Sequence, residues 1–164
     1  MRESVLLVAV VVVLIILTTS AFYAISNDVR QNSSLSQCDG SIWTHVHAPS
    51  RLEVISLCIT ASGVVENVLN EPDGDLHLLL RLDSQYSNLT NSANNLYQHG
   101  YLVVEIICVS VPTQADSVSA CLNYTNKIPI PKTNQHITVT GPYVLDSEHY
   151  YWAEIHPVYS LKIS

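Results

Sequence analysis

The stretch Asp75–Asp83, with the sequence DLHLLLRLD, constrains the fold more than any other part of the chain. Leucines alternate in it with polar residues, and successive side chains of a β-strand point to opposite faces. One face of this predicted strand therefore turns toward a core and carries Leu76, Leu78, Leu80 and Leu82. The outward face carries Asp75, His77, Arg81 and Asp83.

Four further segments have the composition of strands, namely residues 51–68, 101–109, 136–146 and 150–163. Gly63 lies inside the first of them, and a glycine within a strand often marks a bulge or a sharp bend at a barrel corner. Between the second and third of these segments, Thr113 begins the stretch TQADSVSACLNY. Thr113 can cap a helix there, with Asp116 in a capping-box position. We read residues 84–100 as a polar loop.

This order predicts a mainly β domain over residues 51–164, with five strands and one short helix between strands 3 and 4. A bent first strand in such an order is typical of the OB-fold, a Greek-key barrel that binds ligands on its strand 2–3 face and nearby loops. A small β-sandwich is the alternative, which five strands serve less well.

The N-terminal residues 1–27 contain the unbroken apolar run Val5–Leu17, followed by a stretch of low polarity to Ile25. A transmembrane helix needs about 20 such residues, and a signal peptide needs a shorter apolar core before small residues at a cleavage site. We expect a single-pass anchor in the cell membrane with the domain outside the cytoplasm, or a secreted domain if the segment is cleaved. Residues 28–50 read as a linker, whose last ten residues are more apolar and are expected to pack onto the domain.

The chain has four cysteines, and an even number in an exported domain favours two disulfides. Cys108 with Cys121 would close a short loop, and Cys38 with Cys58 follows by subtraction. The other interpretation is that Cys58 and Cys108 are buried thiols within strands.

Polar residues on three strands could share one outer face. In an OB barrel strand 3 lies between strands 2 and 5, so residues that point outward from these strands would converge. Two imidazoles and two carboxylates are a plausible ligand set for zinc, with calcium a second possible ion. The predicted metal ligands are His77, Glu105, Glu154 and His156. A polar face for another ligand, and a plain solvated face, are the alternatives.

Other ligand-binding positions surround this face, namely Asp73, Asp75, Asp146 and Trp152, and His149 could join from the turn between strands 4 and 5. His45 and His47 alternate on one side of the preceding segment and form either a metal pair or part of the packing. Several aromatic residues lie in or near the loops, where ring faces can bind sugars as well as single-stranded bases.

The net charge of −7 argues against a nucleic-acid partner, because phosphate contacts need a basic surface. Arg81 is the only arginine near the motif Asp73-Gly74-Asp75, which resembles the D-G-D of staphylococcal-type nucleases. In that family threonine follows the second Asp, and this chain has Leu76. The residue pattern contains no nucleophile motif such as G-x-S-x-G, and we assign no catalytic residue.

The motifs D-G-D-x-H at residues 73–77 and E-I-H-P-V at residues 154–158 resemble recurrent marks of a family of uncharacterised exported or membrane-anchored OB-type domains. The resemblance covers roughly residues 43–163. It implies the fold but no established activity, and it points to Asp73, Asp75, His77, Glu105, Asp146, Glu154 and His156. Where this chain has His149-Tyr150-Tyr151-Trp152, many relatives read H-G-W. The chain therefore has one more residue between the histidine and the tryptophan, and His149 is not among the positions to which the resemblance points.

Together these observations predict an extracytoplasmic, membrane-anchored binding module, with a metal ion, a glycan or a partner protein on the strand 2–3–5 face. The alternative function is a metal-dependent hydrolase that uses the same face, in a nuclease-like manner.

Overall fold

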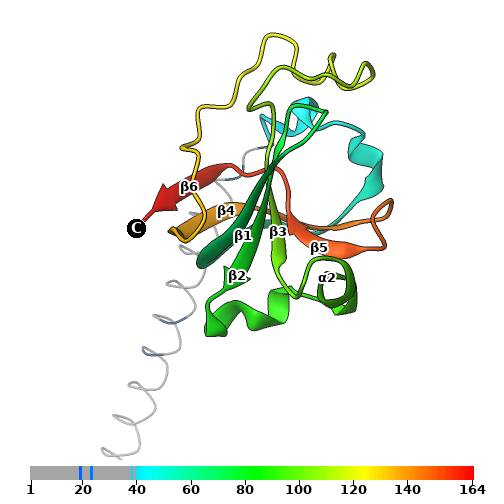
Figure 1. Ribbon diagram of the computed structural model, residues 1–164. Coiled ribbons are helices and arrows are strands. Elements are labelled where there is room, and N and C mark those ends of the chain that lie inside the picture. The colour runs from blue at the N-terminus through cyan, green and yellow to red at the C-terminus, as the bar shows by residue number, and fades with distance from the viewer. Residues whose placement is uncertain (1–18, 20–22, 24–37, 39) are drawn as a thin grey trace, which may run out of the picture. The chain divides into compact units, whose positions relative to one another are not determined.

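The computed structural model describes residues 19, 23, 38 and 40–164. Contacts divide the chain into Met1–Ser36 and Gln37–Ser164, and all the described strands belong to the second unit. This unit is mainly β, as the sequence predicts, with strands β1 (Leu52–Asn70), β2 (Leu76–Leu82), β3 (Leu102–Ile106), β4 (His136–Asp146), β5 (Trp152–Ile155) and β6 (Ser160–Ile163) (Figure 1).

The strands form one sheet in the order β1-β2-β3-β5-β4-β6, and β1 also pairs with β4. The pairings therefore run from β1 through β2, β3, β5 and β4 back to β1. All of them are antiparallel except the one between β3 and β5, which is parallel.

Strand β1 serves two partners because it is 19 residues long. Its first part pairs with β4 and its last part with β2, and Gly63 is in register with both Leu82 and Ile137. A Cβ atom at Gly63 would lie 2.3 Å from the carbonyl oxygen of Arg81. The glycine thus marks the point where the strand exchanges partners, and a register shift follows between Val65 and Asn67.

The prediction of five strands is wrong by one. The segment expected to be a single last strand is interrupted after Ile155, and the chain turns to form β6, which pairs with β4. Pro157 lacks the N–H that a strand ladder needs, so the ladder of β5 does not continue through it.

The helix predicted between strands 3 and 4 is also wrong, because residues 114–123 form a series of turns. Thr113, expected to cap a helix, instead donates its hydroxyl and its backbone N–H to the carbonyl of Pro72. Ser117 donates its hydroxyl to the carbonyl of Gln114, and such local bonds compete with helix formation.

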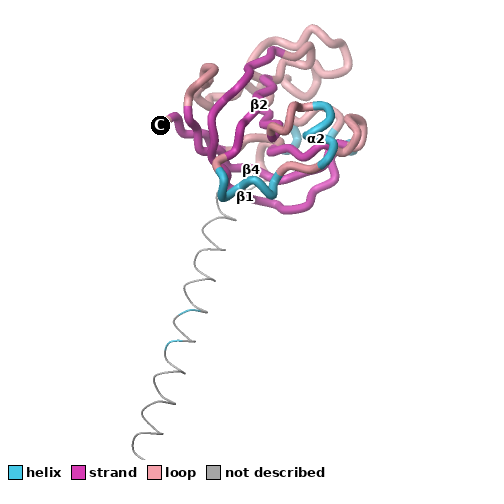
Figure 2. Tube along the Cα trace, turned by 60° about the horizontal axis from the view of Figure 1, so that its bottom comes forward, coloured by secondary structure: helices cyan, strands magenta, loops and turns pink. Residues whose placement is uncertain are grey.

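Helical structure appears instead in the stretch predicted as a polar loop, as the 3₁₀-helix η3 (Ser84–Leu89) and the α-helix α2 (Ser92–Tyr97). Asn91 caps α2 by accepting the N–H groups of Ala93 and Asn94, and the Asn94 side chain returns a bond to the Asn91 N–H. This capping box is built from asparagines in place of the usual Ser or Thr with Glu or Gln. Figure 2 shows that the helical segments are short beside the strands.

The main core lies between the inner faces of the strands and confirms the alternation in β2. Leu76, Leu78 and Leu80 are buried in it, and Leu82 packs against it. Strand β3 adds Leu102, Val104 and Ile106, and β5 adds Ala153 and Ile155. Tyr151, which the alternation also placed inside, lies in the preceding turn and is 52% exposed.

A second apolar cluster covers the opposite face of the sheet. It consists of the buried residues Val46, Leu52, Ile107, Cys108 and Val144, with Ile42 and Trp43 packed against it. Val144 is the register partner of Glu154, so the two side chains leave the sheet on the same face. The segment that precedes β1, which contains η1 (Trp43–His45) and η2 (Pro49–Arg51), therefore packs onto the domain as expected.

Both predicted disulfides are present, Cys38–Cys58 and Cys108–Cys121. The first ties residue 38 to β1, and the second closes a loop across a sequence separation of 13. A helix long and apolar enough to cross a membrane is not found in the part of the chain that the structure describes. The predicted anchor, residues 1–27, lies almost entirely outside that part.

Candidate functional site

The four predicted metal ligands lie together. His77 Nδ1 is 3.1 Å from Glu105 Oε1, and His156 Nδ1 is 3.4 Å from Glu105 Oε2 and 3.1 Å from Glu154 Oε2. Glu105 therefore sits between the two imidazoles. The polar cluster, as we name these residues together with Asp75, lies on the face of the sheet opposite to the main core.

The register of the sheet explains this convergence. His77 of β2 faces Glu105 of β3 directly, and Glu154 of β5 faces Val103, two residues from Glu105 on the same side. His156 follows the end of β5, and its backbone N–H bonds to the carbonyl of Pro142. Three adjacent strands thus present their polar side chains to one another.

The expectation that this face is an outer surface is wrong. His77 and Glu105 are each 5% exposed, and Glu154 and His156 are fully buried. The second apolar cluster and the chain segments that carry it cover the face. Burial makes each unpaired charge or polar atom in the cluster costly in free energy. The hydrogen-bond partners of these side chains therefore affect the stability of the fold far more than they would on an exposed strand.

Asp75, which is 2% exposed, joins the cluster from the turn that precedes β2. Its Oδ1 accepts the backbone N–H of Cys108 at 2.7 Å, and its own N–H bonds to Asp73 Oδ1 at 3.1 Å. Asp75, Glu105 and His156 each offer one ligand atom, and these three atoms lie within 4.8 Å of one another. The sequence predicted Glu105 and His156 as metal ligands together with His77 and Glu154, and Asp75 as a residue that binds another ligand. In the structure Asp75 takes the place of His77 and Glu154 in the tighter group.

Two atoms of this group have no hydrogen-bond partner among the described residues. They are Asp75 Oδ2 and His156 Nε2, and both are buried. Buried polar atoms are almost always paired in native proteins, and an exception calls for an explanation such as a bound ion or water. The unpaired atoms come from two different elements, the turn before β2 and the residue after β5.

The electrostatics of the cluster reflect burial and close opposite charges. Burial, followed by repulsion from Asp73 and Glu105, raises the pKa of Asp75 to about 7. Burial would also raise the pKa of Glu105, but the charge of His156 and the hydrogen bond from His77 outweigh it and lower that pKa. Burial opposes protonation of His156, yet the carboxylates of Glu105 and Glu154 raise its pKa above the ordinary value.

A polar pocket of about 280 Å³ opens beside the cluster. His77 and Glu105 belong to both the cluster and the pocket wall, so the pocket gives access to the buried group. Its remaining lining residues are His47, Ala48, Arg51, Glu71, Pro72, Asp73, Gln114, Glu148, His149 and Trp152.

Asp146 organises one side of this pocket although it is itself fully buried. It forms an ion pair with Arg51, and its Oδ2 accepts a hydrogen bond from His149 Nδ1 at 2.9 Å. The His149 ring stacks on Trp152 with 4.6 Å between the ring centroids, and Trp152 Nε1 donates to Glu154. Asp146 and Trp152 therefore position other groups. Asp73 and Trp152 line the pocket, and Asp146 does not.

Several pocket residues were not singled out by sequence reasoning, among them Arg51, Glu71, Gln114 and Glu148. Arg51 begins the segment 51–68, which has the composition of a strand but no clear alternation, so the direction of its side chain could not be predicted. Arg81, the arginine nearest the nuclease-like motif in the sequence, is far more exposed and pairs with Glu66. His47 lines the pocket, whereas His45 stacks on Tyr124 and bonds to the carbonyl of Ala120, so the two histidines do not act as a pair.

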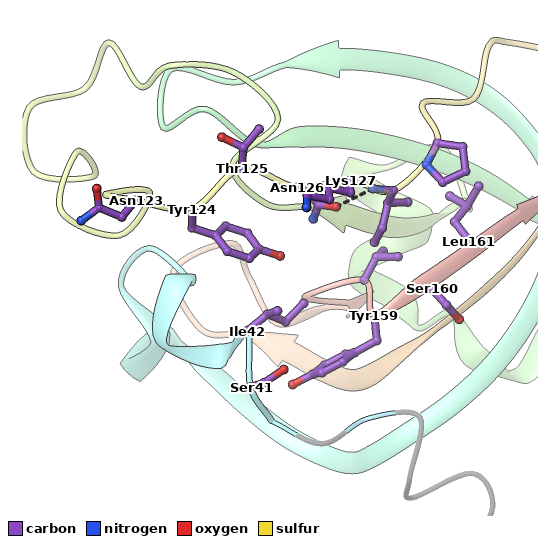
Figure 3. A pocket seen from close by; sticks show the side chains of 13 residues that line it. Ser41, Ile42, Asn123, Tyr124, Thr125, Asn126, Lys127, Tyr159, Ser160 and Leu161 are labelled. Atoms are coloured by element: carbon purple, nitrogen blue, oxygen red, sulfur yellow. Dashed lines mark hydrogen bonds between the residues drawn. The ribbon is translucent and has the colours of Figure 1, made fainter.

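Figure 3 shows a larger pocket of about 790 Å³ at another place in the fold. Tyr124 points into it toward Ile42 and Tyr159, and Lys127 is the only charged residue among those that line it. Its wall is more apolar than that of the pocket beside the cluster. Clustered acids and imidazoles are therefore found only at the smaller pocket of these two.

Comparison with protein-family models and with curated proteins finds no match to this chain.

Proposed function

We propose that this protein is a binding module that holds a divalent metal ion at Asp75, Glu105 and His156. The observation that carries the proposal is the pair of buried, unpaired atoms, Asp75 Oδ2 and His156 Nε2, in a group whose three ligand atoms lie within 4.8 Å of one another. Donors that are each about 2.1 Å from one ion lie at most about 4 Å apart. Small side-chain movements are therefore enough to bring the group around an ion.

The partner of His156 supports coordination through the unpaired nitrogen. His156 Nδ1 is 3.1 Å from Glu154 Oε2, so a proton on Nδ1 donated to Glu154 leaves Nε2 free as a ligand atom. Carboxylate–histidine–metal arrangements of this kind fix the tautomer and raise the basicity of the ligand nitrogen. In this proposal Glu154 and His77 orient the ligands, and they do not contact the ion themselves.

The donor set favours zinc over calcium. Zinc binds imidazole nitrogen together with carboxylate oxygen, and sites with three protein ligands leave a position open. Calcium takes six to eight oxygen ligands, which a group with one imidazole does not suit. The open position would face the pocket, where His77 and Glu105 form part of the wall.

We also propose that the domain is an OB-type Greek-key barrel, held outside the cytoplasm by an N-terminal membrane helix. The barrel is supported by the pairings that lead from β1 through β2, β3, β5 and β4 back to β1, with β6 as an addition. Export is supported by the two disulfides, which persist in oxidising compartments. The anchor is supported by the apolar run Val5–Leu17.

Calorimetric titration of the full, chelator-stripped chain with zinc and with calcium tests the metal proposal. We expect one zinc per chain for the wild type and for His99→Ala, a control that removes an exposed imidazole outside the cluster. Asp75→Asn, which keeps the side-chain volume, and His156→Ala should both abolish binding. Circular dichroism checks that each variant is folded. The proposal fails if the wild type binds neither ion, or if the folded Asp75→Asn variant binds as the wild type does.

A metal-dependent hydrolase is the second candidate function, favoured by the orientation of His149. Its Nδ1 is bound to the buried Asp146, and the ring lines the same pocket as Glu105. An imidazole held by a carboxylate can act as a general base toward a pocket ligand. Zinc-loaded protein should then cleave bis-p-nitrophenyl phosphate, and His149→Gln should lose at least about 100-fold of the rate while it keeps its zinc. Absence of cleavage by the loaded wild type would leave the binding module as the function.

A further inference from the structure

Three exposed tyrosines gather outside the polar cluster, at the turn between β4 and β5 and at the end of α2. Tyr97, Tyr150 and Tyr151 are 41%, 66% and 52% exposed. The rings of Tyr97 and Tyr150 are stacked, with 4.2 Å between centroids and 17° between planes. Together with the neighbouring Leu96, 73% exposed, they form what we name the tyrosine platform. Contiguous exposed aromatic surface of this kind marks interaction sites.

The chain holds these tyrosines in place at a conformational cost. Tyr150 and Tyr151 have φ values of 61° and 62°, a left-handed conformation that costs a non-glycine residue about 1 kcal/mol or more. The Tyr151 N–H bonds to the carbonyl of Asp146 and its own carbonyl accepts from Asn91 Nδ2, each at 2.7 Å. Since the two rings remain largely exposed, packing of the core does not account for this arrangement.

Helix α2 is fixed next to the same turn. Asn94, fully buried, accepts the N–H of Ala153 at 2.8 Å and donates to the carbonyl of Ala153 at 2.9 Å. These bonds attach α2 to β5, beside which it lies in Figure 1. Tyr97 therefore reaches Tyr150 from a rigid element, and the platform is preorganised.

A hollow of about 650 Å³ lies at the platform. It is lined by Tyr97, Tyr150, Tyr151 and Leu96, and by the polar residues Ser92, Ser147 and Glu148. Glu148 also lines the pocket beside the polar cluster. The platform and that pocket are therefore adjacent, so a chain-like ligand could extend from one to the other.

From this geometry we infer that the tyrosine platform binds a neutral carbohydrate chain. The flat C–H faces of a pyranose ring stack on exposed aromatic rings, and its hydroxyl groups can bond to Ser92, Ser147 and Glu148. Among the described residues that line the hollow there is no lysine or arginine. An anionic membrane surface or a phosphate backbone would need such residues, so the charge of the hollow favours an uncharged, hydroxyl-rich ligand.

Calorimetric titration of the full chain with cellohexaose, chitohexaose and mannohexaose tests the inference. We expect at least one of them to bind, Tyr150→Ala to weaken that binding at least about tenfold, and Tyr150→Phe to retain it because the ring is kept. Leu57→Ala, which removes an equally exposed apolar side chain on β1 (66% exposed), should bind as the wild type does.

The inference is overturned if none of the three sugars binds or if Tyr150→Ala binds as tightly as the wild type. It is also overturned if anionic phosphatidylserine vesicles bind in place of the sugars with the same sensitivity to Tyr150→Ala. Binding should persist in chelator-stripped protein and in Asp75→Asn. A failure of the metal proposal and a failure of this inference are therefore separate results.

Discussion

His77 on β2 and Glu105 on β3 are direct register partners, and their Nδ1 and Oε1 atoms lie 3.1 Å apart at a position where both side chains are almost fully buried. Glu105 also lies 3.4 Å from His156. Glu105 thus contacts both buried imidazoles. Such a pairing is weak evidence for net stabilisation, yet breaking it is costly, because His77 would keep only the partly exposed Glu71 at 3.7 Å and His156 only Glu154.

Replacement of Glu105 by alanine in the metal-free protein should therefore lower the free energy of unfolding by about 3–5 kcal/mol. The matched control is Glu53→Ala, an exposed glutamate on β1, for which we expect a change of less than about 0.5 kcal/mol. Urea unfolding followed by fluorescence measures both. Equal stability of the two variants would show that Glu105 does not compensate the imidazoles.

Gly63 provides a test of the sheet itself. A Cβ atom there would lie 2.3 Å from the carbonyl oxygen of Arg81, a backbone atom of the paired strand. Gly63→Ala should therefore cost about 1–3 kcal/mol through forced displacement of β2, whereas Ser56→Ala, at a half-buried position of the same strand, should cost less. Denaturant unfolding of both variants gives the comparison. A Gly63→Ala variant as stable as the wild type would mean that the backbone of β2 does not lie so close to Gly63.

The alternation in residues 75–83 was enough to predict which side of β2 faces the main core. The same two-residue period, applied to the neighbouring predicted strands, grouped His77 with Glu105, Glu154 and His156. Local periodicity reports the two faces of a strand, and the polar residues do share one face. It does not report what covers that face. Val46, which helps to cover it, lies in the predicted linker, and Ile107 lies in the turn that follows β3, where the alternation of the strand has ended.

The contribution of Asp75 and the loss of the predicted helix have a related cause. Asp75 enters the cluster through a turn held by the backbone of Cys108, and Thr113 bonds to Pro72 in place of capping a helix. Both contacts join residues more than 30 positions apart. Local capping and turn rules cannot anticipate such contacts, because the competing partner is supplied by the tertiary fold.

The surface pair of Asp83 and His136 predicts a pH dependence. Hydrogen bonds from Ser62 and from His136 lower the pKa of Asp83. A carboxyl group with a lower pKa in the folded state stabilises the fold above its unfolded pKa, about 3.9, and this contribution is lost as the pH falls through the folded pKa. Asp83→Asn should therefore lower the melting temperature at pH 6, and the difference from the wild type should be smaller at an acid pH below the unfolded pKa.

Thermal melts at the two pH values measure this difference, with Glu53→Gln, an exposed acid on β1, as the variant that should match the wild type at both. A difference for Asp83→Asn that persists unchanged in acid would show that the hydrogen bonds do not depend on ionisation of the carboxylate.

Asn94 connects stability with the tyrosine platform. Its fully buried side chain bonds to backbone groups of Asn91, Tyr101 and Ala153. Asn94→Ala leaves several buried backbone groups without partners, and each such loss costs about 1–3 kcal/mol. We expect a total of about 2–4 kcal/mol in urea unfolding, against less than about 0.5 kcal/mol for Asn95→Ala, its exposed neighbour.

The same variant tests whether α2 must be held in place for the tyrosine platform to bind sugar. Asn94 attaches α2 to β5 and is not among the residues that line the hollow, so its loss removes no direct contact with the sugar. If Tyr97 must be held beside Tyr150, folded Asn94→Ala should bind the hexasaccharides more weakly than the wild type and still bind zinc as the wild type does. Parallel sugar and zinc titrations below the melting temperature measure the two effects. Undiminished sugar affinity would mean that Tyr150 and Tyr151 suffice without a fixed α2, and a loss of zinc binding would mean that the two sites are coupled through β5.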